Sequence, residues 1–511
     1  MSKKISLFLL AISFFIGLFS TNVTAKAEIS KENLNNVKAY ITQQFLNAGI
    51  VGGSYAIVSN GQVIDSSGVG YSDVKLEKKA TAETIYAIAS VTKSLTATAI
   101  LQLQEQGKLN VNDPVQKYLP WFTYKDREKS KSVTIQHLLT HSVGVNRIDA
   151  DGAIFTDEKS NRNSLDDSIR ALRNVEMIAD PGEKGQYCNS CFNTLGLIIE
   201  EITGISYYDY MKSKVFQVLG MDHTAFGQDL KTIDSQDIAK EYSWFFGLRN
   251  TNLLNHQTFG KSQDPEGGIY TNSVDLAKYV SSILGNEPNP LLSQATLKMS
   301  YDGVVATEHK SWEYTNGGLE VGELSNQTLL YKGGDGIGSS AVIMMLPDEN
   351  LGVILMIGES NSEPKKAIAM GMLQILIGEE ATLSDFPPPP FKIIGFMMLF
   401  LVVASIVILV YLGWAITKRL NRKDRTIKYR WLKICIGLLC LLSSIIIGYL
   451  LLFVRPTQIG FYGFLYDWAI GLISLEITLL VGVCYNFYLG IFGKKGNKRE
   501  KSADGKKTRN L

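Results

Sequence analysis

The segment Ala89-Ser90-Val91-Thr92-Lys93-Ser94 begins the stretch of sequence on which the fold assignment depends. An Ala- and Leu-rich run, Thr92–Gln106, ends at Gly107, which predicts a helix with a glycine at its C-terminus. Ser90 would lie at the start of this helix, with Lys93 one turn further along the same face. A serine hydroxyl needs a neighbouring base or cation to act as a nucleophile. The pattern S-x-x-K also occurs by chance, and Lys93 would then be a solvated surface residue.

A second candidate segment is Tyr187-Cys188-Asn189, directly before the predicted helix Asn193–Thr203. A tyrosine beside a buried lysine ammonium is expected to have a lowered pKa, because the cation favours the phenolate. Tyr187 would then take the serine proton and pass it to the leaving group, and Asn189 would hydrogen-bond Lys93 and a substrate amide. Standing alone, the segment would be read as a turn tyrosine followed by a capping asparagine.

The third candidate segment is Tyr331-Lys332-Gly333-Gly334-Asp335, which leads into the apolar stretch Ser340–Leu346. Glycines allow a substrate to approach the backbone closely. A backbone N–H near Gly334 would pair with that of Ser90 to hold an oxyanion. The alternative is a glycine-rich turn before a strand.

With these three segments in this order, the sequence resembles the serine β-lactamase and penicillin-binding-protein superfamily, specifically its class C β-lactamase-like branch. Residues 90–93 look like its S-x-x-K and residues 187–189 look like its Y-x-N, where class A enzymes carry S-D-N. Residues 109–115, 135–144 and 267–270 are also similar, and the resemblance spans roughly residues 35–375. The resemblance implies a mechanism through an acyl-enzyme. It implies three catalytic residues, Ser90, Lys93 and Tyr187, and five substrate-binding residues, Asn189, Lys332, Gly333, Gly334 and Tyr331.

The third segment departs from the family pattern, in which relatives carry Lys-Thr-Gly or His-x-Gly. Lys332-Gly333-Gly334 fits the first form with Gly in place of Thr, whereas counting back from Ser339-Ser340 puts Tyr331 at the histidine position. We favour Lys332, because it keeps a cation for a substrate carboxylate.

The resemblance and the hydrophobic patterning predict the same fold class, an α/β (α+β) domain with an antiparallel sheet flanked by helices and a helical subdomain. Helices are expected at Lys31–Ala48, with apolar positions at Val37, Ile41, Phe45 and Leu46, and at Glu363–Ile377. Strands are expected in pairs, at Gly53–Val58 with Val63–Val69 and at Ser340–Leu346 with Leu351–Ile357. The first and last parts of the chain would then share one sheet.

The N-terminus has the pattern of a secretory signal peptide, with Lys3-Lys4, an apolar run and small residues near position 25. The alternative is an uncleaved N-terminal anchor. This reading assigns residues 1–25 to the signal peptide and 26–386 to the hydrolase domain. Residues 26–390 carry 31 basic and 44 acidic residues, a net charge of −13, which argues against a nucleic-acid partner.

Four prolines, at 387–390, form a predicted stiff linker before three apolar runs in residues 391–493, namely Ile393–Ile416, Leu432–Val454 and Phe464–Ile491. Each run is long enough to cross a bilayer as a helix. The loop 417–430 and the tail 494–511 are rich in Lys and Arg, so the positive-inside rule puts both in the cytoplasm and the hydrolase domain outside it. Glu476 lies within the third run, where an acidic residue can be a functional site. We favour the alternative, a helix–helix hydrogen bond or a protonated group.

The cysteines and histidines give weaker signals. Cys188 and Cys191 form a C-x-x-C pair, which we expect to be unpaired small side chains, although an oxidising compartment would allow a disulfide beside Tyr187. His137 and His141 are four residues apart, but in the resembling family this segment is structural. No metal and no organic cofactor is implied.

The sequence therefore predicts a membrane-anchored serine hydrolase outside the cytoplasm. The resemblance implies D-Ala-terminated peptidoglycan peptides, related D-amino-acid amides or esters, or β-lactams as substrates. Three alternatives stay open: a carboxylesterase or D-aminopeptidase of the same fold, a penicillin-binding sensor that is acylated without turnover, and a transporter or channel subunit whose function resides in the helices.

Overall fold

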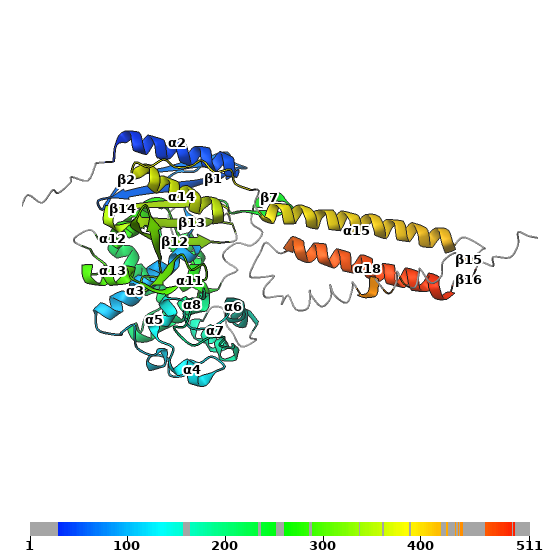
Figure 1. Ribbon diagram of the computed structural model, residues 1–511, viewed down its shortest axis with the longest axis horizontal. Helices are drawn as coiled ribbons and strands as arrows, with labels where there is room; N and C mark the ends of the chain where they lie inside the picture. Colours follow the sequence, from blue (N-terminus) through cyan, green and yellow to red (C-terminus); the bar gives the residue numbers. More distant parts are fainter. Residues whose placement is uncertain are drawn as a thin grey trace, which may run out of the picture.

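The computed structural model describes most of the chain, and the course of its elements is seen in Figure 1. The described residues are 29–156, 164–232, 237–251, 260–285, 289–336, 338–359, 362–387, 390–420 and 466–492, with the short pieces 426–427, 435, 438, 440–442 and 494–495. The predicted signal peptide and most of the basic tail lie outside them.

A nine-stranded antiparallel sheet forms the centre of the described domain, in the order β3-β2-β1-β14-β13-β12-β11-β10-β9. Strand β1 pairs along its length with β14, so the two ends of the domain share one sheet, as the sequence predicts. The strand bounds are β1 Gly52–Ser59, β2 Gln62–Asp73, β3 Lys78–Lys79, β9 Gly303–Ala306, β10 Glu313–Thr315, β11 Glu320–Leu324, β12 Gln327–Asp335, β13 Ser340–Leu346 and β14 Leu351–Ile357.

Two helices from opposite ends of the domain, α2 (Lys31–Ala48) and α14 (Ser362–Leu376), cover one face of the sheet (Figure 1). Ser30 caps the start of α2, and Gly49, in the left-handed region at φ 65°, ends it. Val37, Ile41 and Phe45 are buried against the sheet, as expected. Leu46, the fourth of these apolar positions, is instead 71% exposed.

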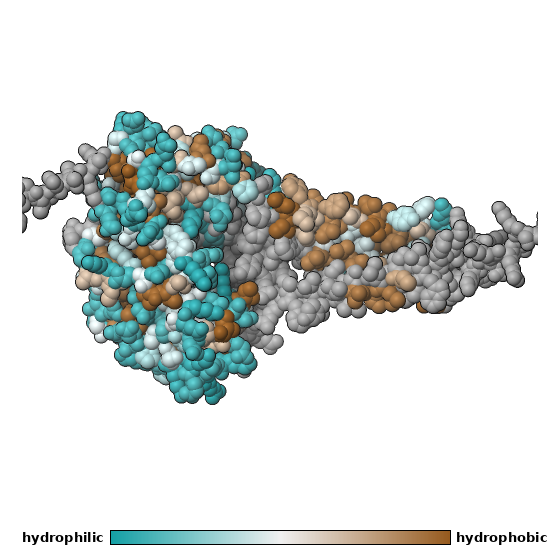
Figure 2. Space-filling model, viewed as in Figure 1, coloured by the Kyte–Doolittle hydropathy of each residue, from teal (hydrophilic) through white to brown (hydrophobic). Residues whose placement is uncertain are grey.

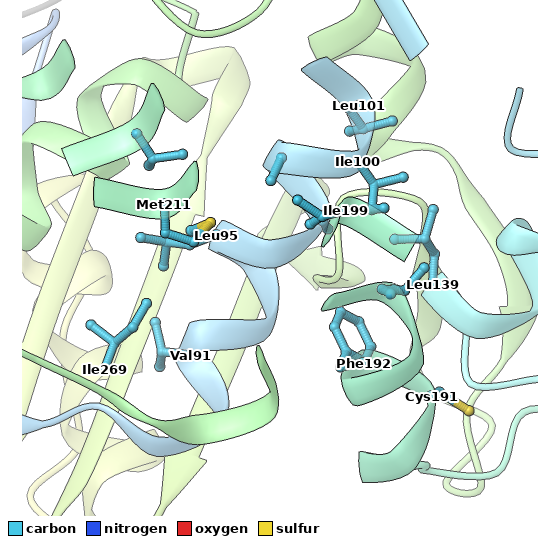
Figure 3. Close-up of a cluster of buried hydrophobic side chains, with 14 of the residues drawn as sticks. Val91, Leu95, Ile100, Leu101, Leu139, Cys191, Phe192, Ile199, Met211 and Ile269 are labelled. Atoms are coloured by element: carbon cyan, nitrogen blue, oxygen red, sulfur yellow. The ribbon is translucent and has the colours of Figure 1, made fainter. Parts of the chain in front are cut away.

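The other face of the sheet carries a larger helical region built around α3 (Thr92–Glu105). Every residue of α3 from Thr92 to Leu103 is buried, because the helix is surrounded by other elements on all sides. Figure 3 shows Val91 on the side of Ile269 and Leu95 on the side of Met211, while Ile100 lies toward Ile199. The core therefore fixes the start of α3 between the sheet and α8 (Asn189–Thr203).

The remaining described elements complete this region and its margins. The helices are α4 Arg127–Lys131, α5 Ile135–Leu139, α6 Arg147–Thr156, α7 Leu165–Arg170, α9 Tyr207–Met211, α10 Gln217–Leu219, α11 Asp264–Gly267, α12 Ser273–Ile283 and α13 Gln294–Tyr301. The strands are β4 Tyr86–Ala87, β5 Ala225–Phe226, β6 Tyr242–Phe245, β7 Leu248–Thr251, β8 Ile269–Thr271, β15 Thr426–Ile427 and β16 Lys494–Lys495.

Two long apolar helices follow the domain, α15 (Pro390–Leu420) and α18 (Tyr466–Phe492). They lie side by side in Figure 1, and Figure 2 shows apolar side chains along α15. Within the described residues, one stretch, Lys392–Lys418, is long and apolar enough to cross a membrane, and Ile470–Asn486 is a shorter apolar helix. Most of the predicted span Leu432–Val454 lies outside the described residues. The predicted linker ends one residue early, since Pro390 already belongs to α15.

Candidate active site

Ser90 lies in a single 3₁₀ turn, η1 (Ala89–Val91), that runs directly into α3. Ala89, the residue before it, has φ 44°, a left-handed conformation that a non-glycine residue rarely adopts. Such backbone strain persists only where the surrounding structure enforces it, and it concentrates at functional sites. The turn presents Ser90 at the helix start that the sequence predicts.

Lys93 is fully buried, and its ammonium is held by three oxygen atoms. It donates hydrogen bonds to Ser90 Oγ at 3.1 Å, to the Glu266 carbonyl at 2.7 Å and to Glu266 Oε2 at 3.1 Å. Burial lowers the pKa of Lys93 to about 8, and the Glu266 carboxylate opposes that shift. Lys93 therefore has far more neutral amine near neutral pH than an ordinary lysine, which makes it suited to accept the proton of the serine.

Glu266 belongs to the site but was missed in the sequence. It lies in the short helix α11, and its side chain is 11% exposed in the ion pair with Lys93. Two signals were available: an acidic residue stands directly before the family-like segment 267–270, and a buried lysine needs a nearby counter-charge.

Tyr187 lies beside the serine and lysine, between two ammonium groups. Its ring centre is 5.1 Å from Lys93 Nζ and 5.2 Å from Lys332 Nζ, and it stacks on His141 at 4.4 Å. The expected lowering of its pKa was wrong. Burial raises the pKa of Tyr187 and outweighs the opposing effects of Lys332 and the Ser90 hydroxyl. Tyr187 is therefore a neutral phenol that can donate or relay a proton.

Asn189 is also at the site, but with a different partner from the one expected. Its amide nitrogen donates to Asp151 Oδ2 at 3.0 Å instead of facing Lys93, and its buried amide oxygen has no hydrogen-bond partner among the described residues. Burial, reinforced by the nearby Glu266, raises the pKa of Asp151 to about 7. Arg147, at 3.4 Å, pairs with the same carboxylate.

The prediction of unpaired cysteines was wrong, because Cys188 and Cys191 form a disulfide. Both are fully buried at the start of α8, and Cys188 is the N-cap residue of that helix. The Cys188 N–H donates to His141 Nδ1 at 3.0 Å. The disulfide and this hydrogen bond hold the backbone that directly follows Tyr187. His137 instead caps α5 through Thr134, and the described residues hold no cluster of three or more metal-ligating side chains.

The two candidates in the third segment point to opposite faces of the sheet. Lys332 is buried beside Tyr187, with Glu320 Oε1 3.8 Å away, whereas Tyr331 packs against Trp312 and Lys366 on the face covered by α2 and α14. Neighbouring residues of a strand alternate between faces, so only one of them can reach the serine. The structure brings Lys332 to the site and leaves Tyr331 outside it.

Gly334 lies directly against the turn that carries the serine. A Cβ atom at Gly334 would be 2.1 Å from the Ile88 carbonyl oxygen and 2.9 Å from the Ser90 nitrogen, so a side chain has no room there. At Gly333 the nearest atom would be the Tyr331 hydroxyl, at 2.3 Å. Lys365, a buried residue that sequence reasoning missed, donates to the Gly334 carbonyl at 2.8 Å and fixes this strand end.

A family profile identifies the family of this chain, and several known proteins are similar to it. The profile of the family described as Beta-lactamase matches residues 37–376. "Protein flp" of Staphylococcus aureus strain COL is 27% identical over 438 residues, covering 83% of this chain and 84% of that protein. "Teichoic acid D-alanine hydrolase" of Staphylococcus aureus is 29% identical over 246 residues, covering 47% and 56%.

Two solved structures share the fold. The octameric penicillin-binding protein homologue from Pyrococcus abyssi has a TM-score of 0.60 at 26% identity, covering 72% of this chain and 81% of that one. EstCE1, a hydrolase with promiscuous acyltransferase activity, has a TM-score of 0.59 at 21% identity, covering 69% and 100%, and shows the fold alone. Since the profile spans well over half of the sequence, the chain belongs to the beta-lactamase family and is a serine hydrolase of the β-lactamase and penicillin-binding-protein fold.

Proposed function

We propose that this protein is a membrane-anchored, extracytoplasmic serine hydrolase that forms an acyl-enzyme on Ser90 with D-alanine-containing envelope substrates or β-lactams. The observation that carries the proposal is the 3.1 Å contact between Ser90 Oγ and Lys93 Nζ, with Tyr187 between Lys93 and Lys332. A nucleophile, a base of suitable pKa and a second proton carrier are thereby within one site.

In the proposed acylation step, neutral Lys93 accepts the Ser90 hydroxyl proton while Oγ attacks the substrate carbonyl. The tetrahedral intermediate collapses when the bond to the leaving amine or alcohol breaks, and the leaving group takes a proton from Tyr187. Tyr187 recovers its proton from the Lys93 ammonium, so the step is balanced. In deacylation, water takes the place of the leaving group, and the same proton transfers in the reverse order regenerate Ser90 and release the acid.

The oxyanion of the intermediate would be held by the Ser90 N–H and by an N–H at the end of β12. Gly336 N–H donates to the Ser339 carbonyl, so even-numbered residues of β12 bond to β13 and odd-numbered ones face the other side. Strand β11 begins at Glu320, opposite Tyr331, so its pairing with β12 does not extend to the N–H of Asp335. We assign the second oxyanion donor to Asp335, next to Gly334.

Lys332 is proposed to receive a substrate carboxylate. Its buried ammonium makes no hydrogen bond within the described residues, and Glu320 is too distant to satisfy it. A terminal D-alanine supplies such a carboxylate. The relative named as a teichoic acid D-alanine hydrolase supports D-alanyl esters as a second substrate class, in which the carboxyl group is esterified and Lys332 has no carboxylate to bind.

The apolar helix at 392–418 and the basic residues that follow it support membrane anchoring with the hydrolase domain outside. A carboxylesterase, a D-aminopeptidase and a sensor that is acylated once use the same Ser90 chemistry. They differ in the leaving group and in the rate of deacylation.

The test is intact-mass analysis of the full-length protein in detergent, incubated separately with a penicillin, a D-Ala-D-Ala peptide and a short-chain ester. We expect a covalent adduct and product release with the wild type, and neither with Ser90→Ala. Turnover of every substrate by Ser90→Ala would overturn the proposal. An adduct that is never released would identify the sensor.

A further inference from the structure

The hairpin formed by β6 and β7 carries an apolar tip at the junction between the domain and α15. Its sequence from Trp244 to Leu248 is Trp-Phe-Phe-Gly-Leu. The rings of Phe245 and Phe246 pack edge to face with centres 4.7 Å apart, and Leu248 is 61% exposed. A tip with several large apolar side chains at the surface of a domain with a net charge of −13 needs an explanation.

The hairpin turn is in direct contact with the first turns of α15. A Cβ atom on Gly247 would be 2.5 Å from the ring of Phe396, and strands β6 and β7 both contact the helix (Figure 1). The position of the tip relative to a bilayer is therefore set by the position of Phe396.

The length of the apolar stretch determines that position. The 27 residues Lys392–Lys418 extend roughly 40 Å as a helix, about the thickness of a bilayer including its headgroups. Centring the hydrocarbon core of about 30 Å between the two lysines leaves roughly 5 Å at each end, or about three residues. Phe396 then lies at the boundary between headgroups and hydrocarbon, and the hairpin tip lies beside it.

The charged residues around the tip are also consistent with a position at the boundary between headgroups and hydrocarbon. Lys392 Nζ is 5.2 Å and Arg249 Cζ is 4.8 Å from the ring centre of Trp244. Tryptophan beside a lysine is typical of the headgroup layer, where the ring is half-solvated and the ammonium meets lipid phosphates.

The stem of the hairpin is fixed to the substrate-binding part of the domain. Arg249 pairs with Glu359 at 3.1 Å, and Tyr242 N–H donates to the Gly358 carbonyl at 2.9 Å. Glu241, at its base, packs against Gly338 in the turn after β12. A bilayer that holds the tip would therefore also fix the distance between the membrane surface and the end of β12, which forms part of the active site.

We propose that the Trp244–Leu248 tip inserts into the outer leaflet at the headgroup boundary and fixes the orientation of the active site over the membrane. The occupant of this apolar surface is lipid. The proposal rests on the proposed membrane anchoring by α15.

The test measures depth in the full-length protein, with Cys435, Cys440 and Cys484 replaced by Ser and the disulfide kept. Single cysteines at Leu248→Cys, Val407→Cys and Met299→Cys carry an environment-sensitive fluorophore. The protein is reconstituted in phosphatidylglycerol vesicles containing lipids with a doxyl quencher either near the headgroup or deep in the chain. Val407 is an exposed mid-span position, and Met299 is an exposed apolar position on α13 in the domain.

We expect the Leu248 probe to lose more than half of its fluorescence with the shallow quencher and less with the deep one, the reverse at Val407, and no loss at Met299. Adding Phe245→Ser and Phe246→Ser should remove most of the loss at Leu248 while hydrolysis of a soluble ester continues. Quenching at Val407 without quenching at Leu248 would overturn the hairpin proposal and leave the anchoring intact. No quenching at Val407 would overturn the anchoring itself. Shielding at Leu248 that depends on protein concentration and not on lipid would identify a second copy as the occupant.

Discussion

The ion pair between Lys93 and Glu266 gives the sharpest prediction. Glu266→Gln removes the negative charge 3.1 Å from the Lys93 ammonium but keeps an oxygen acceptor, and the backbone carbonyl of residue 266 still accepts at 2.7 Å. Burial lowers the pKa of Lys93 to about 8 even though Glu266 opposes it. An adjacent opposite charge shifts a pKa by about 1–3 units, so the substitution should lower the pKa of Lys93 by about that much again.

The expected consequence is a shift in the pH dependence of acylation. The acidic limb of kcat/KM reports the pKa of the base in the free enzyme, and here the base must be neutral to accept the Ser90 proton. That limb should lie near pH 8 in the wild type and move down by about 1–3 pH units in Glu266→Gln. Each unit corresponds to about 1.4 kcal/mol and to nearly tenfold more neutral amine well below the pKa.

The assay is hydrolysis of a chromogenic ester or β-lactam between pH 5 and 9. Glu200→Gln is the control, since Glu200 is a partly buried carboxylate on α8 that accepts from the Tyr207 N–H, whereas the Lys93 ammonium donates to Ser90 and Glu266. Its profile should match the wild type. An acidic limb that stays in place or moves to higher pH in Glu266→Gln would refute the assignment of Lys93 as the base.

Three further predictions concern the other parts of the site. Tyr187→Phe should slow release of the acyl-enzyme, because the phenol relays protons, and unchanged release in a mass-spectrometric time course would contradict that role. Gly334→Ala should abolish acylation, since its Cβ would lie 2.1 Å from the backbone oxygen of Ile88, directly before the serine turn. Gly333→Ala should be milder, because its Cβ would meet only side-chain atoms, and burst kinetics measures both effects. Lys332→Met should raise KM for a D-Ala-terminated peptide by roughly tenfold or more, because it removes a charge-assisted contact. The control Tyr331→Phe should leave KM unchanged. Equal effects of the two substitutions would argue against a substrate carboxylate at Lys332.

The local elements were predictable from short-range patterns. Apolar period and turn residues predicted the helix Lys31–Ala48 and the strands Ser340–Leu346 and Leu351–Ile357, and the structure has the same bounds. These signals survive in the sequence because each depends on neighbours within a few residues. Each of the three site segments is also a short local motif, so their order along the chain predicted the family.

The chemistry of the site depends on contacts between distant parts of the chain, which no local pattern encodes. Glu266 reaches Lys93 across 173 residues, and the pKa of Tyr187 is raised because the fold buries the ring more effectively than its cationic neighbours favour the phenolate. Because side chains alternate along a strand, the sequence puts Tyr331 and Lys332 on opposite faces of the sheet. Only the packing of α2 and α14 decides which of these two residues points toward Ser90. The sequence thus determined the elements and the reactive groups, whereas the tertiary structure determined their partners and protonation, because burial and electrostatic fields are properties of the assembled core.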